Sequence, residues 1–325
     1  MWPRKPHVPR GPDRWCRPSV RLNAARRCPC AMTQRWDTEH ESVQRMVNMR
    51  DGVSHVQVGA HSLCVRISGM EQQVPEPGRA GVPLLLVHGF GGSLASWQLV
   101  TPTLARTRPV IAFDLPGHGE SSQAVGEGSV AFFAGVTAGL LDALDVPCAH
   151  VVGHSLGGAV ALSLLAHKPE KVRALSLLAP AGLSRCVNMA FIEGFVQATT
   201  PEALLEAMAM AVYAKGLVGR KAALVQLAQL NRPGVRAALQ QVVEACFRGG
   251  EQAVDLRAVL HASPVACQII WGREDAVLPL PPTEGLVQPP HGLLLEQTGH
   301  LPQLERPTVV AQALAAFAAQ EAQAP

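Results

Sequence analysis

The sequence predicts an α/β protein with a mostly parallel, doubly wound sheet and a helical cap insertion. Three observations support this fold class. Short, continuous apolar runs alternate with helical patterns of ten to fifteen residues, which is typical of parallel strands that are covered on both faces. Loops rich in turn residues follow several of these runs. The alternation stops between residues 183 and 260, where only helical patterns occur, and then resumes.

The composition is that of a globular chain. Of its 325 residues, 48% are hydrophobic, which is enough for a substantial core. The formal net charge of +3 arises in the first 45 residues, which hold ten Lys and Arg against four Asp and Glu. Residues 46–325 hold eighteen against twenty-one, so the main part of the chain does not indicate a nucleic-acid partner. No apolar run approaches the ~18 residues of a membrane span, and we expect no membrane partner.

Eight cysteines are scattered along the chain, and none forms the paired two-residue spacing of metal or redox sites. Several lie in apolar runs. We interpret most of them as small buried hydrophobic residues in a reducing compartment, so we expect a cytoplasmic protein. The eight are Cys16, Cys28, Cys30, Cys64, Cys148, Cys186, Cys246 and Cys267.

Residues 1–48 are expected to form a disordered leader, because six prolines lie among many arginines and no hydrophobic period is present. The segment has no apolar h-region, which argues against a secretory signal. Two alternatives stay open. One is an organelle transit peptide, since the segment is rich in arginine and poor in acids. The other is an upstream start codon, with translation from Met32 or Met46.

The first predicted element is a hairpin. From His55 to Ile67 the residues alternate around Gly59, as in two antiparallel strands. The strands that follow are continuous apolar runs, and Ser129 can cap the first long helix. The expected elements are a strand at 83–89, a strand at 108–114, a helix at 129–144, a strand at 148–152, a helix at 159–166 and a strand at 172–179.

The second half of the chain contains the insertion. Helical patterns at 201–212 and 221–230 indicate an all-helical cap over residues 183–260. Strand-like runs return at 265–271 and 292–296, and a last helix is expected over 307–319, with Pro307 in its first turn. The predicted division is a leader at 1–48, a core formed by 49–182 and 261–325, and the cap at 183–260.

The segment Gly153-His-Ser-Leu-Gly157 matches the nucleophile-elbow pattern, in which a serine occupies a strained turn between a buried strand and a helix. Glycines are required beside this serine, because a Cβ at either position would make strand and helix collide. The apolar run before the motif and the helical pattern after it supply the expected context. Ser155 is therefore the candidate nucleophile.

A serine hydroxyl needs a base that takes its proton, and the base needs an acid that orients it. Asp275 and His300 follow the last two predicted strands, in the chain order Ser, Asp, His that accompanies this elbow. Glu274 is an alternative acid. The alternative bases at the same edge of the sheet are His88, His118 and His154, and Asp114 is interpreted as a structural loop residue.

Attack on a carbonyl also needs donors for the oxyanion. The backbone N–H groups of Leu156, directly after the nucleophile, and of Phe90, in the glycine-rich loop after the first long strand, are the candidates; Gly91 is the alternative to Phe90. A metal site is not indicated, since His150 and His154 straddle a strand and a turn. No phosphate-cradling loop is present, and no cofactor is implied.

Five motifs stand at the ends of predicted strands: HGFGGS at 88–93, DLPGHGES at 114–121, GHSLGG at 153–158, WGRED at 271–275 and GH at 299–300. Through these motifs, the chain from Met49 onward resembles the α/β-hydrolase superfamily with a helical cap. Ser155 stands where haloalkane dehalogenases and epoxide hydrolases carry aspartate, which argues against those two activities.

A more specific resemblance is to the hydrolase domain of acetoin-cleaving-system dihydrolipoamide acetyltransferases, through LAPAGL at 178–183 and FIEGF at 191–195. Those proteins join a lipoyl domain to the hydrolase, and the N-terminal segment here is too short and too rich in proline and arginine for one. The meta-cleavage C–C hydrolases are also similar. They tend to have asparagine before the nucleophile and tryptophan after the histidine, where this chain has His154 and Leu301.

These observations predict a serine hydrolase, carboxylesterase-like, that cleaves an ester, thioester or related acyl bond of a small to medium, fairly apolar substrate. Met208, Met210 and Tyr213 indicate an apolar pocket under the cap, with ordinary helix packing as the alternative. Three other functions stay open: acyl transfer within an acetoin-dehydrogenase-type complex, C–C bond hydrolysis, and non-catalytic binding on the same fold. The sequence does not indicate an oligomeric state.

Overall fold

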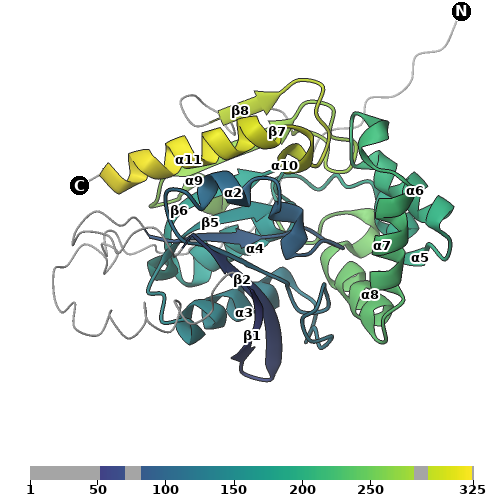
Figure 1. Cartoon of the computed structure of the whole chain (residues 1–325), viewed down its shortest axis with the longest axis horizontal. Coiled ribbons are helices and arrows are strands. Elements are labelled where there is room, and N and C mark those ends of the chain that lie inside the picture. Colours follow the sequence, from purple (N-terminus) through teal and green to yellow (C-terminus); the bar gives the residue numbers. More distant parts are fainter. Residues whose placement is uncertain (1–51, 70–81, 282–291, 324–325) are drawn as a thin grey trace, which may run out of the picture.

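The computed structural model describes residues 52–69, 82–281 and 292–323 (Figure 1). The expected leader over residues 1–48 lies outside the described residues. Within them, a single eight-stranded sheet has the order β1-β2-β4-β3-β5-β6-β7-β8. The strands are β1 (Val53–Val58), β2 (His61–Ser68), β3 (Leu84–Val87), β4 (Val110–Phe113), β5 (Ala149–His154), β6 (Val172–Leu178), β7 (Cys267–Gly272) and β8 (Gly292–Leu295).

The sheet is mixed at one edge and parallel over the rest. β1 pairs with β2 and β2 with β4 in antiparallel register, and every pair from β4 to β8 is parallel. The tight turn between β1 and β2 contains Gly59 at a φ of 56°, and Val58 lies opposite His61. The predicted opening hairpin and the predicted mostly parallel sheet are therefore confirmed.

Helices cover both faces of the sheet. Alternate residues of each strand point to opposite sides, so buried apolar side chains lie on both faces. Leu85 and Val87 join one buried cluster, with α3 and α4, while Leu84 and Leu86 join the other, with Trp97 and α11. The helices, including short 3-10 turns marked η, are η2 (Leu94–Trp97), α2 (Thr101–Leu104), α3 (Val130–Ala143), α4 (Leu156–His167), η3 (Pro169–Lys171), α5 (Met189–Gln197), α6 (Pro201–Met210), η4 (Lys215–Leu217), α7 (Arg220–Leu230), α8 (Val235–Cys246), η5 (Arg248–Gly250), α9 (Arg257–His261), α10 (Pro302–Glu305) and α11 (Pro307–Gln323).

The helix boundaries follow local sequence signals. The Ser129 hydroxyl accepts a hydrogen bond from the Phe132 amide at 3.1 Å and caps α3, as predicted. Thr200 caps α6 in the same way, with Pro201 in the first turn. α11 begins at Pro307, as expected, and continues past the expected end at residue 319.

The segment between β6 and β7 contains helices and no strand. We call α5 to α8 the cap helices; they gather at one end of the molecule (Figure 1). The backbone N–H of Asn188, just before α5, donates to the Val277 carbonyl at 2.9 Å and ties the cap helices to the loop after β7. The division into core and cap at residues 182 and 261 stays a prediction.

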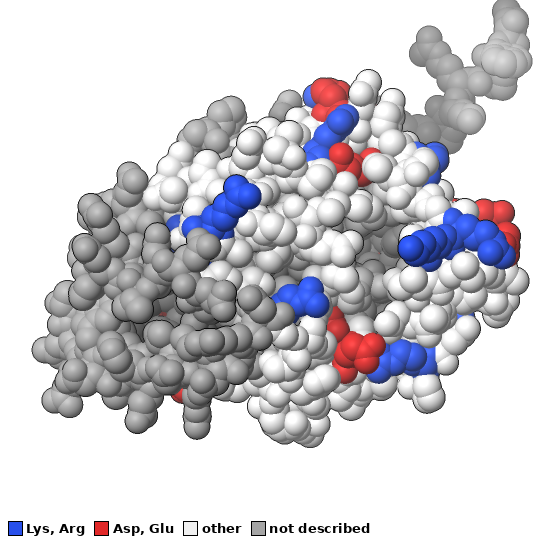
Figure 2. All heavy atoms as spheres, in the orientation of Figure 1, with Lys and Arg blue, Asp and Glu red and all other residues white. Residues whose placement is uncertain are grey.

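The surface charges are mixed in sign. Figure 2 shows a face that is mostly uncharged, with small groups of basic and acidic side chains. Among the described residues, Arg232 and Glu120 form an ion pair at 2.5 Å. No helix in the described part of the chain is long and apolar enough to span a membrane. Cys64, Cys148 and Cys246 are buried, as expected, whereas Cys186 is exposed, and no disulfide joins the described cysteines.

Candidate active site

Ser155 occupies the turn between β5 and α4. Its backbone has φ 53° and ψ −118°, outside the regions that residues with a side chain usually adopt. A Cβ at Gly153 would lie 2.3 Å from the Gly157 carbonyl oxygen, and one at Gly157 would lie 2.2 Å from the Val87 carbonyl oxygen. The two glycines thus allow strand, turn and helix to approach closely enough for this strained serine.

Ser155, His300 and Asp275 form one hydrogen-bonded line. The Ser155 hydroxyl donates to His300 Nε2 at 2.9 Å, and His300 Nδ1–H donates to Asp275 Oδ2 at 2.8 Å. The three residues come from the loops after β5, β7 and β8, and each is less than 9% exposed. The structure therefore brings together the three side chains that the sequence predicted as a triad.

The Asp275 carboxylate is held by donors on both oxygens. Oδ2 also accepts from the Trp271 indole N–H at 3.0 Å, and Oδ1 accepts from the amides of Val277 and Leu278 at 2.9 Å. The alternative acid, Glu274, accepts instead from the Thr298 amide at 3.0 Å. Asp275, rather than Glu274, therefore faces the imidazole.

The other candidate bases have different partners. His88 is buried, its Nδ1–H donates to the Gly89 carbonyl at 2.8 Å, and its Nε2 accepts from the Leu115 amide at 2.9 Å. Burial lowers the pKa of His88 to about 4. His118 donates to the Pro116 carbonyl at 3.0 Å, and burial lowers its pKa to about 3. Both rings are thus neutral and structural at ordinary pH.

Asp114 has the structural role that the sequence indicated. Its carboxylate accepts from the Leu94 amide at 2.6 Å and from the Glu120 amide at 2.7 Å. It thereby joins the loop after β3 to the loop after β4. Both loops lie at the edge where Ser155 is found, so Asp114 shapes the site without contacting the serine.

The sequence did not indicate the contact that His154 makes with the loop of the base. Its Nε2–H donates to the backbone carbonyl of His300 at 2.8 Å, and the two ring centroids are 4.9 Å apart. Burial is the main cause that lowers the pKa of His154 to about 3. The only sequence signal for this contact was its position directly before Ser155.

The candidate oxyanion donors, Leu156 and Phe90, belong to segments at the edge of the sheet where Ser155 is found. Leu156 is the first residue of α4, and Phe90 lies in the loop after β3; no acceptor within the described residues takes a hydrogen bond from either amide. The same loop turns at Gly91, with φ 68°, where a Cβ would meet the Phe195 ring at 2.4 Å. Both amides are available to a ligand, and Gly91 remains the alternative to Phe90.

A narrow apolar pocket opens on Ser155. Its volume is about 40 Å³. Met208, Met210 and Tyr213 do not line it. The two methionines are half-buried and pack against the core, which is the alternative that the sequence left open, and Tyr213 is 46% exposed. The lining consists of Phe90, His154, Ser155, Ala181, Val187, Phe191, Ile192, Phe247, Val277, Leu278, His300 and Leu301.

No group of three His, Cys, Asp or Glu side chains in residues 52–69, 82–281 and 292–323 is arranged to hold a metal ion. His150 and His154 both lie in β5 but have separate partners. His150 Nε2 is 2.9 Å from the Ser176 hydroxyl, whereas His154 binds the His300 carbonyl.

Comparison with known proteins identifies the family to which the chain is similar. The family described as alpha/beta hydrolase fold matches residues 82–227. The dihydrolipoyllysine-residue acetyltransferase component of the acetoin cleaving system of Pseudomonas putida is 40% identical over 246 residues, which cover 74% of this chain. The chain spans 64% of that relative's length.

Two further similarities concern other hydrolases. The 2-hydroxymuconate semialdehyde hydrolase of Pseudomonas sp. (strain CF600) is 31% identical over 206 residues, which cover 62% of this chain and 73% of the relative. The solved structure of a meta-cleavage product hydrolase from Pseudomonas fluorescens IP01 has a TM-score of 0.71 at 22% identity and covers 82% of this chain and 97% of its own. At this identity the structural likeness concerns the fold alone.

Proposed function

Because the chain belongs to the α/β-hydrolase family, we propose that it is a serine hydrolase, carboxylesterase-like, that cleaves an ester, thioester or related acyl bond. The observation that carries the proposal is the hydrogen bond of 2.9 Å from the Ser155 hydroxyl to His300 Nε2. It gives the serine a base within reach, and Asp275 fixes that base in the tautomer that accepts a proton.

In the proposed reaction, Ser155 Oγ attacks the acyl carbon while His300 Nε2 takes the hydroxyl proton. Asp275 stabilises the imidazolium that forms, and the amides of Leu156 and Phe90 stabilise the oxyanion. His300 then gives its proton to the leaving alcohol or thiol, and an acyl-enzyme remains on Ser155. A water molecule, deprotonated by His300, attacks the acyl-enzyme and releases the acid.

The pocket supports a small, apolar acyl group. A volume of about 40 Å³ accommodates on the order of three water-sized groups, which suits a short acyl chain. Its lining side chains include no lysine or arginine. Burying a carboxylate without a charged partner is costly. Substrates that carry a carboxylate into this pocket, as 2-hydroxymuconate semialdehyde would, are therefore disfavoured relative to neutral esters and thioesters.

A second candidate is acyl transfer to a thiol within an acetoin-dehydrogenase-type complex. The observation in its favour is the 40% identity to an acetyltransferase component. The same acyl-enzyme serves both reactions, and the acceptor decides between water and thiol. Transfer predicts that a dithiol accelerates acyl release and that lipoylated partners co-purify. C–C bond hydrolysis and non-catalytic binding on this fold are the remaining alternatives.

A fluorophosphonate probe tests the proposal. We expect the wild type and a Ser54→Ala control in the hairpin to be labelled equally, and Ser155→Ala not to be labelled. Absence of labelling in the wild type, or labelling that survives Ser155→Ala, would sink the proposal. A panel of short neutral esters, thioesters and vinylogous diketones, compared by kcat/KM, then separates acyl from C–C cleavage.

A further inference from the structure

The loop that carries His300 is attached to the cap helices by a carboxylate outside the triad. We propose that Glu305, at the end of α10, is a positioning residue that fixes His300 by joining its loop to the segment after α6. This inference rests on the proposed function, because it concerns the base of that reaction. Glu305 does not touch the reacting atoms.

Both carboxylate oxygens of Glu305 are used. Oε1 accepts a hydrogen bond from the Gly299 amide, directly before His300, at 2.7 Å. Oε2 accepts from the Tyr213 amide at 2.8 Å and from the Ala214 amide at 3.4 Å. One side chain therefore bridges the His300 loop and the segment that follows α6.

A second, direct bond joins the same two segments. The His300 amide donates to the Ala211 carbonyl at 2.8 Å, at the C-terminus of α6. Lys215 Nζ donates to the carbonyls of Ala209 and Val212, so the segment 209–215 is also held by hydrogen bonds within itself. The backbone of His300 is thus bound directly to the segment 209–215, which belongs to the cap helices and their connection. The position of His300 therefore depends on the cap helices as well as on the sheet.

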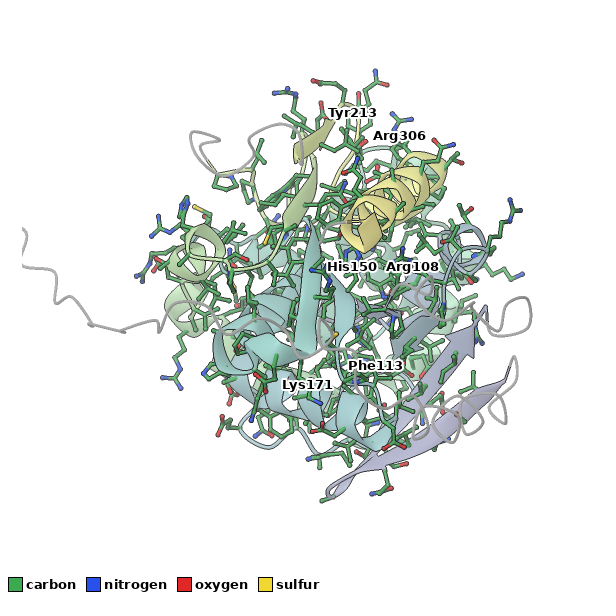
Figure 3. The ribbon with its side chains drawn as sticks, turned by 90° about the vertical axis from the view of Figure 1, so that its left-hand side faces the viewer. Arg108, Phe113, His150, Lys171, Tyr213 and Arg306 are labelled. Carbon is green, nitrogen blue, oxygen red and sulfur yellow. The ribbon has the colours of Figure 1, made fainter. Side chains whose placement is uncertain are left out.

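The next residue supports the other side of the loop. Arg306 donates from Nε to the Thr298 hydroxyl at 3.3 Å and from Nη2 to the Gln297 carbonyl at 3.2 Å. In Figure 3, Tyr213 and Arg306 lie near each other at the top of the view, as expected for a residue bound by Glu305 and the residue that follows Glu305. Glu305, the last residue of α10, and Arg306, which follows it, therefore both bind the loop before His300.

A carboxylate is the side chain that this junction requires. Three backbone N–H groups converge on its two oxygens, and an acceptor-only group satisfies all of them. Glutamine would offer one oxygen and would turn an NH2 group toward an N–H. Because the imidazole must keep 2.9 Å to Ser155 and 2.8 Å to Asp275 at once, a small shift of the loop disturbs both contacts.

The test compares Glu305→Gln and Glu305→Ala with Glu202→Gln, a matched control in which a cap glutamate paired with Arg220 is altered. The kinetic constants are expressed per active site. The number of active sites is measured from the burst of leaving group that accompanies acylation, so that a smaller folded fraction is not mistaken for a slower enzyme. We expect kcat per site to fall on the order of 10²-fold in Glu305→Ala and less in Glu305→Gln, with KM nearly unchanged. The control should match the wild type.

Amide hydrogen exchange gives a readout that needs no turnover. We expect peptides over residues 297–303 and 211–215 to exchange faster in Glu305→Ala than in the wild type, and peptides over α3 to stay unchanged. Unchanged exchange at both segments, or a kcat per site in Glu305→Ala within about threefold of the control, would overturn the proposal. A wild type that is neither labelled by the fluorophosphonate nor active refutes the proposed function instead, and the exchange result still decides whether Glu305 fixes the loop.

Discussion

The imidazole of His154 donates a hydrogen bond of 2.8 Å to the backbone carbonyl of His300. His154 directly precedes Ser155 in the chain, so this bond links the nucleophile turn to the loop of the base through a path separate from the Ser155–His300 contact itself. On its other side, the His300 amide donates to Ala211. The backbone of His300 is therefore held at both its carbonyl and its amide, independently of the contacts that its side chain makes.

Replacement of His154 by alanine should lower kcat about tenfold, because the His300 carbonyl loses its donor and its loop gains freedom. An unsatisfied buried carbonyl also costs about 1–3 kcal/mol of stability. Thermal unfolding and kcat per titrated site measure the two effects. The control is His167→Ala, at the exposed end of α4. Equal kcat in the two variants would contradict this role.

Asp275→Asn should lower kcat on the order of 10³–10⁴-fold, since an amide NH2 in place of Oδ2 would face His300 Nδ1–H and favour the wrong tautomer. The amides of Val277 and Leu278 still find an acceptor at the other oxygen, so the fold should tolerate the change. Glu274→Gln is the matched control, because Glu274 binds the Thr298 amide. A larger loss of kcat in Glu274→Gln than in Asp275→Asn would show that Glu274, and not Asp275, is the acid that orients His300.

The strands and the elbow could be predicted from the sequence because each depends on local signals. Continuous apolar runs mark buried parallel strands, and Gly153 and Gly157 are required by close backbone approach. The pocket could not be predicted in the same way. The face that a cap helix turns toward Ser155 depends on how the helix docks, so Phe191 and Ile192 line the pocket while Met208 does not. Glu305 binds the backbone amide of Tyr213, which is distant in the sequence, and no sequence pattern predicts a contact of a side chain with a distant backbone amide.

His150 should make stability depend on pH. It is buried between β6 and α11, beside Arg108 (Figure 3), and burial, with a smaller effect of the Arg108 charge, lowers its pKa from 6.5 to about 3. Below pH 6.5 the unfolded chain binds a proton at this site that the folded chain does not. The stability from neutral His150 is therefore complete above pH 6.5 and is lost as the pH falls toward 3.

In denaturant unfolding followed from about pH 4.5 to 7.5, His150→Gln should reduce the proton uptake on unfolding by about one near pH 4.5 and by little near pH 7.5. The absolute stability of the variant can differ from that of the wild type, since the slope with pH is the quantity compared. His261→Gln, at the exposed end of α9, should keep the wild-type slope. An unchanged slope in His150→Gln would show that another buried imidazole, such as His118, carries the effect.

Enlarging the pocket should change the acyl preference. Phe191, in the first cap helix, contributes an aromatic ring to the lining and is 8% exposed. Truncating this ring to alanine leaves room for additional methylene groups, each worth about 10–200-fold in discrimination when a pocket fits it. Phe191→Ala should therefore raise the ratio of kcat/KM for a long-chain ester over an acetate ester by about tenfold or more.

Truncation of a buried phenylalanine costs about 3–5 kcal/mol, so Phe191→Leu, which loses less, is measured in parallel and should change the ratio in the same direction. Val225→Ala is the control, because Val225 lies on α7 of the cap and is 60% exposed. The ratio in this variant should equal that of the wild type. If it rises as much as in Phe191→Ala, or if neither Phe191 variant changes it, the pocket on Ser155 does not set the acyl length.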